Sequence, residues 1–295
     1  MVLKASWIYP TKLPQVVERE LEGYGSIERQ ILFKRGLSTA EEAGNFLSMK
    51  MDTGSNPLLM TDMVQAVERI VAAIEHGERI VVYGDYDVDG VTSVALLVGV
   101  IKGFGGRVSH YIPDRFSEGY GLNEAAISAI AGNGVNLLIS VDCGIRDADK
   151  IEYASQLDLD VIVTDHHQPG GIRPSAVAVV NPRQDGDPYP FKDLAGVGVA
   201  FKLVEALARG LGKDVPRGSL ELVALGTVAD VSKLRGENRS LVSLGLEELN
   251  ATKRAGLQEL MKITKLSPGG ITAASIGFII GPRLNAATCP GSNPF

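Results

Sequence analysis

Short runs of β-branched and other apolar residues recur between residues 80 and 180, and segments with helical periodicity separate them. The runs expected to form strands are residues 80–83, 108–112, 137–141, 159–163 and 177–180. Helices are expected over residues 92–101, 124–131 and 148–157. This alternation predicts an α/β fold, with a mostly parallel sheet flanked by helices on both faces. In such sheets, ligands bind beyond the carboxyl ends of the strands.

Helical patterns flank this core on both sides. Residues 1–77 are expected to form a helical lead-in, because two capping-box spacings begin at Ser38 and Thr39 and Gly77 follows an amphipathic segment. Residues 78–190 would then form the α/β core, and residues 191–295 a helical C-terminal extension. The helices expected in the extension are residues 197–211, 220–228, 241–249, 257–263 and 272–280.

Acidic and histidine motifs directly follow three of the predicted strands. They are Asp85-Tyr86-Asp87-Val88-Asp89-Gly90, Val141-Asp142-Cys143-Gly144 and Asp165-His166-His167. A single Asp after a strand usually caps a helix or closes a turn. Three such motifs at neighbouring strand ends are better explained by a metal-dependent phosphoryl-transfer site, which needs hard oxygen and imidazole ligands.

Gly90 indicates a loop that curls the three carboxylates of the first motif around one small volume. A calcium-binding EF-hand is disfavoured, because a helix is expected to begin directly after Gly90 and Leu96 stands where that loop needs an acidic residue. Carboxylate and His ligands without cysteinate favour manganese or magnesium over structural zinc. Asp230 is a weaker candidate, since a lone Asp that ends an apolar helix is more often solvated.

Composition limits the range of functions. The 295 residues carry 29 basic and 35 acidic side chains, a net charge of -6, which argues against a general polyanion binder. A specific nucleic-acid site remains possible under a locally basic groove. Cys143 and Cys289 are too few for a disulfide framework, so free thiols and the reducing cytoplasm are expected. No apolar run is long enough for a membrane span.

Together, these motifs resemble those of the DHH phosphoesterases, and within that family those of the exonucleases specific for single-stranded DNA. The segments that carry the resemblance at the site are Tyr83-Gly84-Asp85-Tyr86-Asp87-Val88-Asp89-Gly90, Ser140-Val141-Asp142-Cys143-Gly144, Thr164-Asp165-His166-His167 and Gly226-Thr227-Val228-Ala229-Asp230. Similar segments elsewhere are Phe116-Ser117-Glu118-Gly119-Tyr120-Gly121-Leu122, Asn181-Pro182-Arg183, Gly196-Val197-Gly198-Val199-Ala200 and Gly281-Pro282-Arg283-Leu284-Asn285-Ala286-Ala287. Residues 78–190 are thereby identified as a DHH catalytic core.

The resemblance implies two divalent ions, Mn²⁺ or Mg²⁺. The implied metal ligands are Asp87, Asp89, Asp142, His166 and Asp230. Asp142 and Asp87 would bridge the two ions. The implied catalytic residues are Asp85 and Asp165, which would orient the ligands, and His167, which would face the scissile phosphate.

Residues near the phosphate backbone of a substrate are also implied. They are Arg115, Tyr120, Asn238, Arg239, Arg283 and Asn285. Arginine suits bidentate phosphate contacts, although these arginines could equally form surface ion pairs. For Tyr120, base stacking and a core or hinge position both stay open.

The function implied is a metal-dependent phosphodiesterase, a 5′ to 3′ exonuclease on single-stranded DNA that acts in DNA repair and recombination. The family implies a single-strand-binding protein and a helicase as partners. Members of this group continue into a second catalytic-half domain and an oligonucleotide-binding fold, and the residues after Ala287 depart from the Gly-Arg of the family pattern. We therefore expect a truncated catalytic core whose cleft is open on one side.

Two alternatives remain. A small-substrate DHH phosphodiesterase would act on short oligonucleotides or cyclic dinucleotides, but the segments outside the site count against it. A noncatalytic binding protein could keep the fold, yet every ligand position is filled. Inorganic pyrophosphatase activity is disfavoured, because Tyr83 stands where a His is expected.

Overall fold

The computed structural model describes residues 12–47 and 54–287. The chain divides into two compact units, Met1–Met51 and Asp52–Phe295. The domain boundaries expected at residues 77 and 190 stay predictions. No helix within the described ranges is long and apolar enough to cross a membrane.

The first unit contains three short helices: α1 (Gln15–Glu20), α2 (Ser26–Lys34) and α3 (Ala40–Leu47). Its core is small and consists of Leu13, Val17, Leu21, Leu32 and Ala43. At the start of α3, the Glu42 amide donates to Thr39 Oγ1 at 3.2 Å and the Glu42 carboxylate accepts from the Thr39 amide at 3.1 Å. Of the two overlapping capping-box spacings, this pair therefore forms the reciprocal cap.

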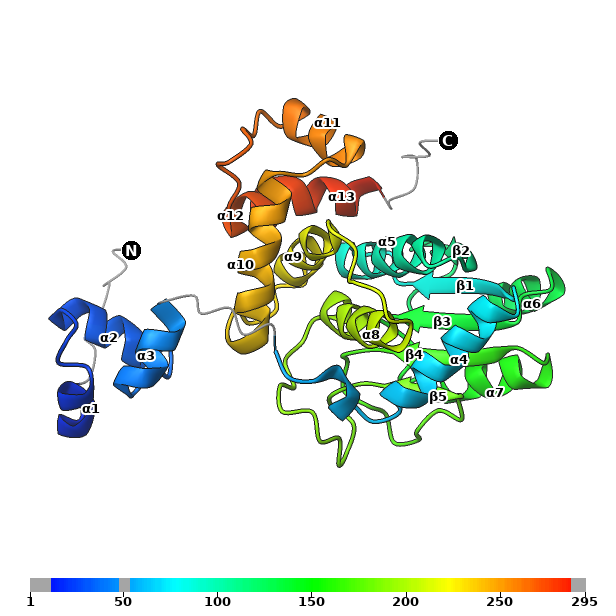
Figure 1. Ribbon diagram of the computed structural model, residues 1–295, viewed down its shortest axis with the longest axis horizontal. Helices are drawn as coiled ribbons and strands as arrows, with labels where there is room; N and C mark the ends of the chain where they lie inside the picture. The colour runs from blue at the N-terminus through cyan, green and yellow to red at the C-terminus, as the bar shows by residue number, and fades with distance from the viewer. Residues whose placement is uncertain (1–11, 48–53, 288–295) are drawn as a thin grey trace, which may run out of the picture. The chain divides into compact units, whose positions relative to one another are not determined.

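The second unit is built on a five-stranded parallel sheet in the order β2-β1-β3-β4-β5 (Figure 1). The strands are β1 (Arg79–Gly84), β2 (Arg107–Tyr111), β3 (Leu137–Val141), β4 (Asp160–Thr164) and β5 (Ala178–Val180). The helices that accompany them are α4 (Met63–Glu75), α5 (Val88–Gly103), α6 (Glu124–Gly132), α7 (Ala148–Gln156) and α8 (Gly196–Gly210). The predicted α/β fold with a parallel sheet is confirmed.

Side chains of each inner strand alternate between two apolar cores. In β1, Ile80 and Val82 belong to the core shared with α4, α5 and α8, whereas Val81 and Tyr83 belong to the core shared with α6 and α7. Because successive side chains in a strand point to opposite faces, a sheet covered on both sides needs strands that are apolar throughout. The β-branched runs of the sequence meet this need.

The strand register brings the ends of four strands to one level. Gly84 of β1 pairs with Val141 of β3, which pairs with Thr164 of β4, and Thr164 pairs with Val180 of β5. The next residues along the chain, Asp85, Asp142, Asp165 and Asn181, therefore start the loops from the same edge. From β1 the chain passes to β2 on one side, and from β2 it crosses to β3 on the other side of β1. The carboxyl edge between β1 and β3 is therefore the topological switch point, where ligands bind in open α/β sheets.

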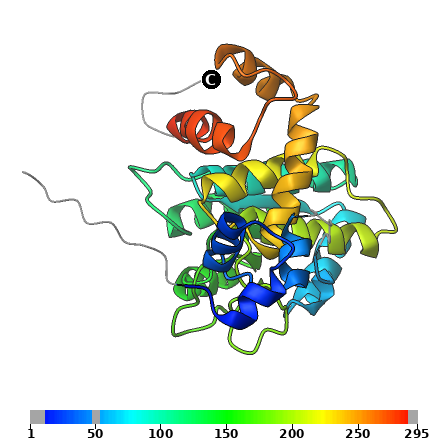
Figure 2. The same cartoon turned by 90° about the vertical axis from the view of Figure 1, so that its left-hand side faces the viewer.

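Helices predominate after the sheet. They are α9 (Ser219–Ala229), α10 (Gly236–Asn250), α11 (Ala255–Ile263), α12 (Ala273–Ser275), the π-helical turn η2 (Ile276–Ile280) and α13 (Gly281–Ala287); a short helix η1 (Pro57–Leu59) precedes α4. The expected helical extension is thus confirmed. Both views show α10 packed beside α9 (Figures 1 and 2). A Cβ on Gly245 of α10 would lie only 2.1 Å from the carbonyl oxygen of Leu220, so the close approach of the two helices requires glycine.

We expect Gly245→Ala to lower the free energy of unfolding by about 1–3 kcal/mol, because the helices must separate to admit one methyl group. The matched control is Gly99→Ala in α5, where a Cβ would meet no atom within 4 Å. That change should raise the free energy of unfolding by about 0.5–1 kcal/mol through helix propensity alone. Urea unfolding of both variants measures the difference. Equal stabilisation by both substitutions would contradict the close helix contact.

Candidate metal centre

The first acidic motif spans the junction of β1 and α5. Asp87 is the N-cap of α5, and its Oδ1 accepts the Gly90 amide at 3.0 Å. The helix begins at Val88, so the expectation that Gly90 lies in a loop is wrong. A Cβ on Gly90 would lie 2.5 Å from the Asp85 carbonyl oxygen. The glycine therefore permits close packing of the helix start against the strand end, not a turn.

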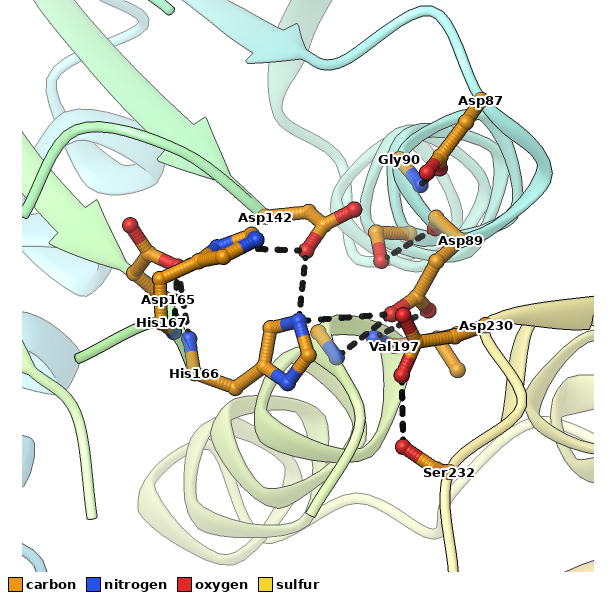
Figure 3. A network of polar contacts seen from close by, with 12 residues as sticks. Asp87, Asp89, Gly90, Asp142, Asp165, His166, His167, Val197, Asp230 and Ser232 are labelled. Atoms are coloured by element: carbon orange, nitrogen blue, oxygen red, sulfur yellow. Dashed lines mark hydrogen bonds and ion pairs between the residues drawn. The ribbon is translucent and has the colours of Figure 1, made fainter. Parts of the chain in front are cut away.

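Asp89 is buried in the first turn of α5, where its carboxylate meets the N-terminus of α8 (Figure 3). Oδ2 accepts the Gly196 amide at 2.7 Å and Oδ1 accepts the Val197 amide at 2.8 Å. These amides are among the unpaired donors at a helix N-terminus, which favours negative charge. Burial and the nearby Asp230 carboxylate nevertheless raise the pKa of Asp89.

Asp142 is buried at the end of β3 with left-handed backbone, φ +59°. Its Oδ1 lies 3.1 Å from His166 Nε2 and has no hydrogen-bond partner among the described residues. Burial, together with Asp89 and the other carboxylates, raises the pKa of Asp142 well above its usual range. A Cβ on Gly196 would lie 2.5 Å from the same Oδ1, which explains the glycine at the start of α8.

His166 presents one ring nitrogen to this cluster. Its Nδ1 lies 3.1 Å from the Leu194 carbonyl oxygen, and because a carbonyl can only accept, Nδ1 carries the proton. Burial lowers the pKa of the ring, so the neutral form with an unprotonated Nε2 is favoured. Nε2 is buried and without a hydrogen-bond partner in the described chain. It has the state that a metal ligand requires.

Asp165 differs from the other carboxylates because its oxygens are already occupied. Oδ1 accepts the amides of His166 and His167 at 2.7 and 3.0 Å and the His167 Nδ1 at 2.7 Å, while Oδ2 accepts the Ile145 amide at 3.0 Å. Burial works against ionisation, yet these hydrogen bonds lower the pKa of Asp165. The hydrogen bond between His167 Nδ1 and Asp165 Oδ1 also raises the pKa of the His167 ring. Asp165 therefore orients His167 and favours its protonated form.

Three overlapping groups of side chains could each hold a cation, since the ligand atoms within each lie within 4.8 Å of one another. The groups are Asp89, His166 and Asp230; Asp142, His166 and His167; and Asp85, Asp87 and Asp142. Asp230, doubtful from sequence, follows the end of α9, and its Oδ2 accepts Ser232 Oγ at 2.5 Å. Asp142 belongs to two groups, whereas Asp87 belongs to one.

The donor atoms fit hard divalent cations. Asp85 Oδ1, Asp142 Oδ1 and His166 Nε2 are buried without hydrogen-bond partners among the described residues, a costly arrangement that a cation would relieve. Burial raises the pKa of Asp85 to about 6. Cys143 is a buried free thiol in the core beneath α6 and α7, and belongs to none of these groups. Oxygen and imidazole donors suit Mn²⁺ and Mg²⁺. Cys289 lies outside the described residues.

A pocket of about 250 Å³ adjoins the cluster. Its lining residues are Asp87, Val88, Asp89, Ala229, Asp230, Gly277, Gly281, Pro282 and Asn285. Arg115 approaches Asn285, with Nη2 3.4 Å from Oδ1, and its guanidinium stacks 4.3 Å from the centre of the Tyr86 ring. Arg283 is exposed and donates to the Ile279 carbonyl at 2.8 Å. Two of the expected substrate residues, Arg115 and Asn285, thus lie together beside the acidic cluster.

The remaining expected substrate residues differ in exposure. Tyr120 is 50% exposed; its hydroxyl donates to the Asp142 carbonyl at 3.2 Å and lies 3.2 Å from His167 Nδ1. Asn238 is fully buried and donates to the carbonyls of Asp193 and Lys233, so the geometry favours a structural role for this side chain. Arg239, its neighbour in α10, is half-buried.

Sequence reasoning missed the backbone donors and acceptors of the site. The Leu194 carbonyl orients His166, and the amides of Gly196 and Val197 hold Asp89. The available signal was the Gly196-Val197-Gly198 run at the start of a predicted helix, since glycine is poorly suited to helices unless another group must approach closely.

Comparison with known proteins agrees with this architecture. The model of the DHH family, N-terminal domain, matches residues 79–227, so the chain belongs to the DHH family. Relatives include the single-stranded-DNA-specific exonuclease RecJ of Bacillus subtilis, 47% identical over 256 residues (87% of this chain, 32% of the relative), and that of Escherichia coli, 37% identical over 272 residues (88% and 46%). A crystal structure of RecJ from Thermus thermophilus in complex with Mn²⁺ is 32% identical with a TM-score of 0.77, covering 94% of this chain and 39% of that one. The chain therefore spans about a third to a half of the length of these curated relatives.

Metal binding can be tested through stability. At a Mn²⁺ concentration 100-fold above Kd, we expect stabilisation of about 2.7 kcal/mol, seen as a higher Tm. Asp142→Asn should abolish this shift without lowering the Tm of the metal-free protein, because Asn adopts left-handed backbone readily and removes a repelling carboxylate.

The control for Asp142→Asn is Asp158→Asn, which changes an exposed aspartate with a similar left-handed backbone, φ +54°. This variant should keep the full Mn²⁺ response. A Tm shift retained in Asp142→Asn would exclude Asp142 as a ligand. Differential scanning fluorimetry with and without EDTA measures both variants.

Proposed function

We propose that this chain is a metal-dependent phosphodiester hydrolase that removes nucleotides from the 5′ end of single-stranded DNA. The observation that carries the proposal is Asp142 at the switch point of the sheet: its Oδ1 lies 3.1 Å from His166 Nε2 on one side, and it groups with Asp85 and Asp87 on the other. An aspartate shared between two neighbouring sites suits a two-ion centre for phosphoryl transfer. The relatives named as single-stranded-DNA-specific exonucleases support the substrate class.

Two sets of side chains would hold the ions. Asp89, His166 and Asp230 would hold one, and Asp85 and Asp87 would hold the other. Asp142 would be shared between them, because it groups with Asp85 and Asp87 and its Oδ1 lies 3.1 Å from His166 Nε2. This assignment differs from the sequence-based expectation in two ways. Asp85 becomes a direct ligand, and Asp142 alone is shared between the two ions, because Asp87 belongs to only one of the groups. When bound, divalent cations supply the positive charge that activates a water molecule and neutralises the phosphate in the transition state.

The chain's own cationic groups would position the phosphate. His167 is held through Nδ1 by Asp165, which raises the pKa of the ring, so protonation at Nε2 would give a second donor toward the phosphate. Arg115, beside Asn285 at the edge of the pocket, would contact the next phosphate along the strand. Tyr120, half-exposed beside His167, would contact the sugar or base of the terminal nucleotide. No side chain needs to act as a nucleophile.

The cellular setting is also part of the proposal. Action in DNA repair and recombination follows from the family, as do a single-strand-binding protein and a helicase as partners. A cytoplasmic location accords with the buried free thiol of Cys143.

The direct test compares two single-stranded oligonucleotides with Mn²⁺, one labelled at the 5′ end and one at the 3′ end. The proposal expects early release of the 5′ label as mononucleotide and late loss of the 3′ label. Asp142→Asn should reduce the rate by at least 100-fold, and Asp158→Asn should leave it unchanged. Early loss of the 3′ label would reverse the assigned polarity.

Short substrates separate this proposal from the alternatives. If dinucleotides or cyclic dinucleotides are cleaved and longer strands are not, the chain is a small-substrate phosphodiesterase. Binding of single-stranded DNA with no turnover, in protein that shows the Mn²⁺-dependent Tm shift, would instead identify a noncatalytic binding protein.

A further inference from the structure

Five consecutive residues hold two of the candidate metal ligands. Within the segment 193–197, the Leu194 carbonyl accepts from His166 Nδ1 at 3.1 Å, and the amides of Gly196 and Val197 donate to the Asp89 carboxylate at 2.7 and 2.8 Å. His166 follows β4 and Asp89 lies in α5, so the segment contacts ligands that come from two separate elements. Any displacement of the segment would move both ligands.

Asn238, in the first turn of α10, anchors this segment from behind. Its Nδ2 donates to the Asp193 carbonyl at 2.6 Å and to the Lys233 carbonyl at 3.2 Å. The side chain is fully buried, and its Oδ1 has no hydrogen-bond partner among the described residues. A buried unpaired acceptor is costly, so packing alone does not explain an asparagine at this position.

Leu194, Ala195 and Val197 of the segment pack in the main apolar core, and its other polar side-chain contacts from outside the metal site are weaker. Arg183 and Lys233 each approach the Asp193 carboxylate at 3.5 Å, and these pairs lie near the surface. Exposed ion pairs contribute little, whereas a short buried hydrogen bond in low dielectric contributes more. Arg183 also donates to the Lys192 carbonyl at 3.0 Å, one residue before the segment. Among the polar side chains that contact the segment from outside the metal site in the described chain, Asn238 therefore makes the short buried hydrogen bond.

We propose that Asn238 is a positioning residue of the metal centre: it fixes the segment 193–197, and through that segment the ring of His166 and the carboxylate of Asp89. The effect on metal binding rests on the proposed function, but the effect on the His166 ring does not. Loss of the Asn238 amide frees the Leu194 carbonyl to shift, so His166 Nδ1 loses its acceptor. The Nε2–H tautomer, which cannot bind a cation, then becomes populated.

The test uses Asn238→Leu and the isosteric Asn238→Asp, whose ionised carboxylate cannot donate. The matched control is Asn250→Leu in the same helix, roughly 18 Å along the axis at 1.5 Å per residue. Asn250 also bridges a loop, donating to the carbonyls of Leu246 and Ile271 at 2.8 and 3.0 Å, but the loop lies away from the segment. Asn250 Oδ1 also accepts the Ile271 amide at 2.9 Å, so Asn250→Leu removes at least as many structural hydrogen bonds as Asn238→Leu.

The first readout is the His166 tautomer in metal-free protein, measured from long-range proton–nitrogen couplings of the ring and assigned with His166→Gln. The second is the Mn²⁺ Kd by calorimetry. We expect a protonated Nδ1 in wild type and in Asn250→Leu. In both Asn238 variants we expect a larger Nε2–H fraction and a Kd weaker by about 10–100-fold, as for other supporting residues of metal sites.

An unchanged tautomer in a folded Asn238 variant would overturn the proposal, and so would an equal change in Asn250→Leu. Asn238→Asp keeps the shape of the side chain and decides the question if Asn238→Leu does not fold. If wild type binds no Mn²⁺, the proposed metal function fails, while the tautomer comparison still tests whether Asn238 positions His166.

Discussion

Buried carboxylates of like charge meet at the carboxyl edge of β1 and β3, and the surrounding structure is arranged to accommodate them. Asp85, Asp89 and Asp142 are all nearly inaccessible to solvent, and burial raises the pKa of each. Removing a charge from water without a partner costs several kcal/mol. Such a cluster is stable only where amide dipoles, protons or cations compensate the charge.

Backbone amides supply part of that compensation, and they do so unequally. Asp89 receives two amides from the start of α8, and Asp165 receives three amides along with the His167 ring. Asp142 Oδ1 receives no hydrogen bond from the described residues. The protein therefore satisfies the oxygens of Asp165 with its own donors but leaves Asp142 Oδ1 without one. This difference supports the proposed roles, orientation for Asp165 and metal binding for Asp142.

Close packing of backbone around the cluster depends on glycine. A Cβ on Gly196 would strike the Asp142 carboxylate, and one on Gly226 of α9 would lie 2.8 Å from Asp89 Oδ1. Two helices can therefore approach the carboxylates more closely than side chains would permit. The same approach places Asp230, which follows α9, within reach of Asp89 and His166. Asn238 connects α10 to the same region, because its amide donates to the Asp193 carbonyl just before α8.

The sequence alone determined the parallel sheet and the placement of acidic motifs at its edge, because continuous β-branched apolar runs and strand-end positions are local patterns. It also located the helices of the C-terminal half, since amphipathic periodicity is local. Gly90 was misassigned to a loop, because a glycine needed for close packing has the same sequence signature as one needed for a turn. Asn238 was expected at the substrate, although only tertiary structure shows that it is buried behind segment 193–197. The pairing of Asp89 with α8, the tautomer of His166 and the inclusion of Asp230 were decided by contacts between residues 28–141 positions apart in the chain, which no local pattern encodes.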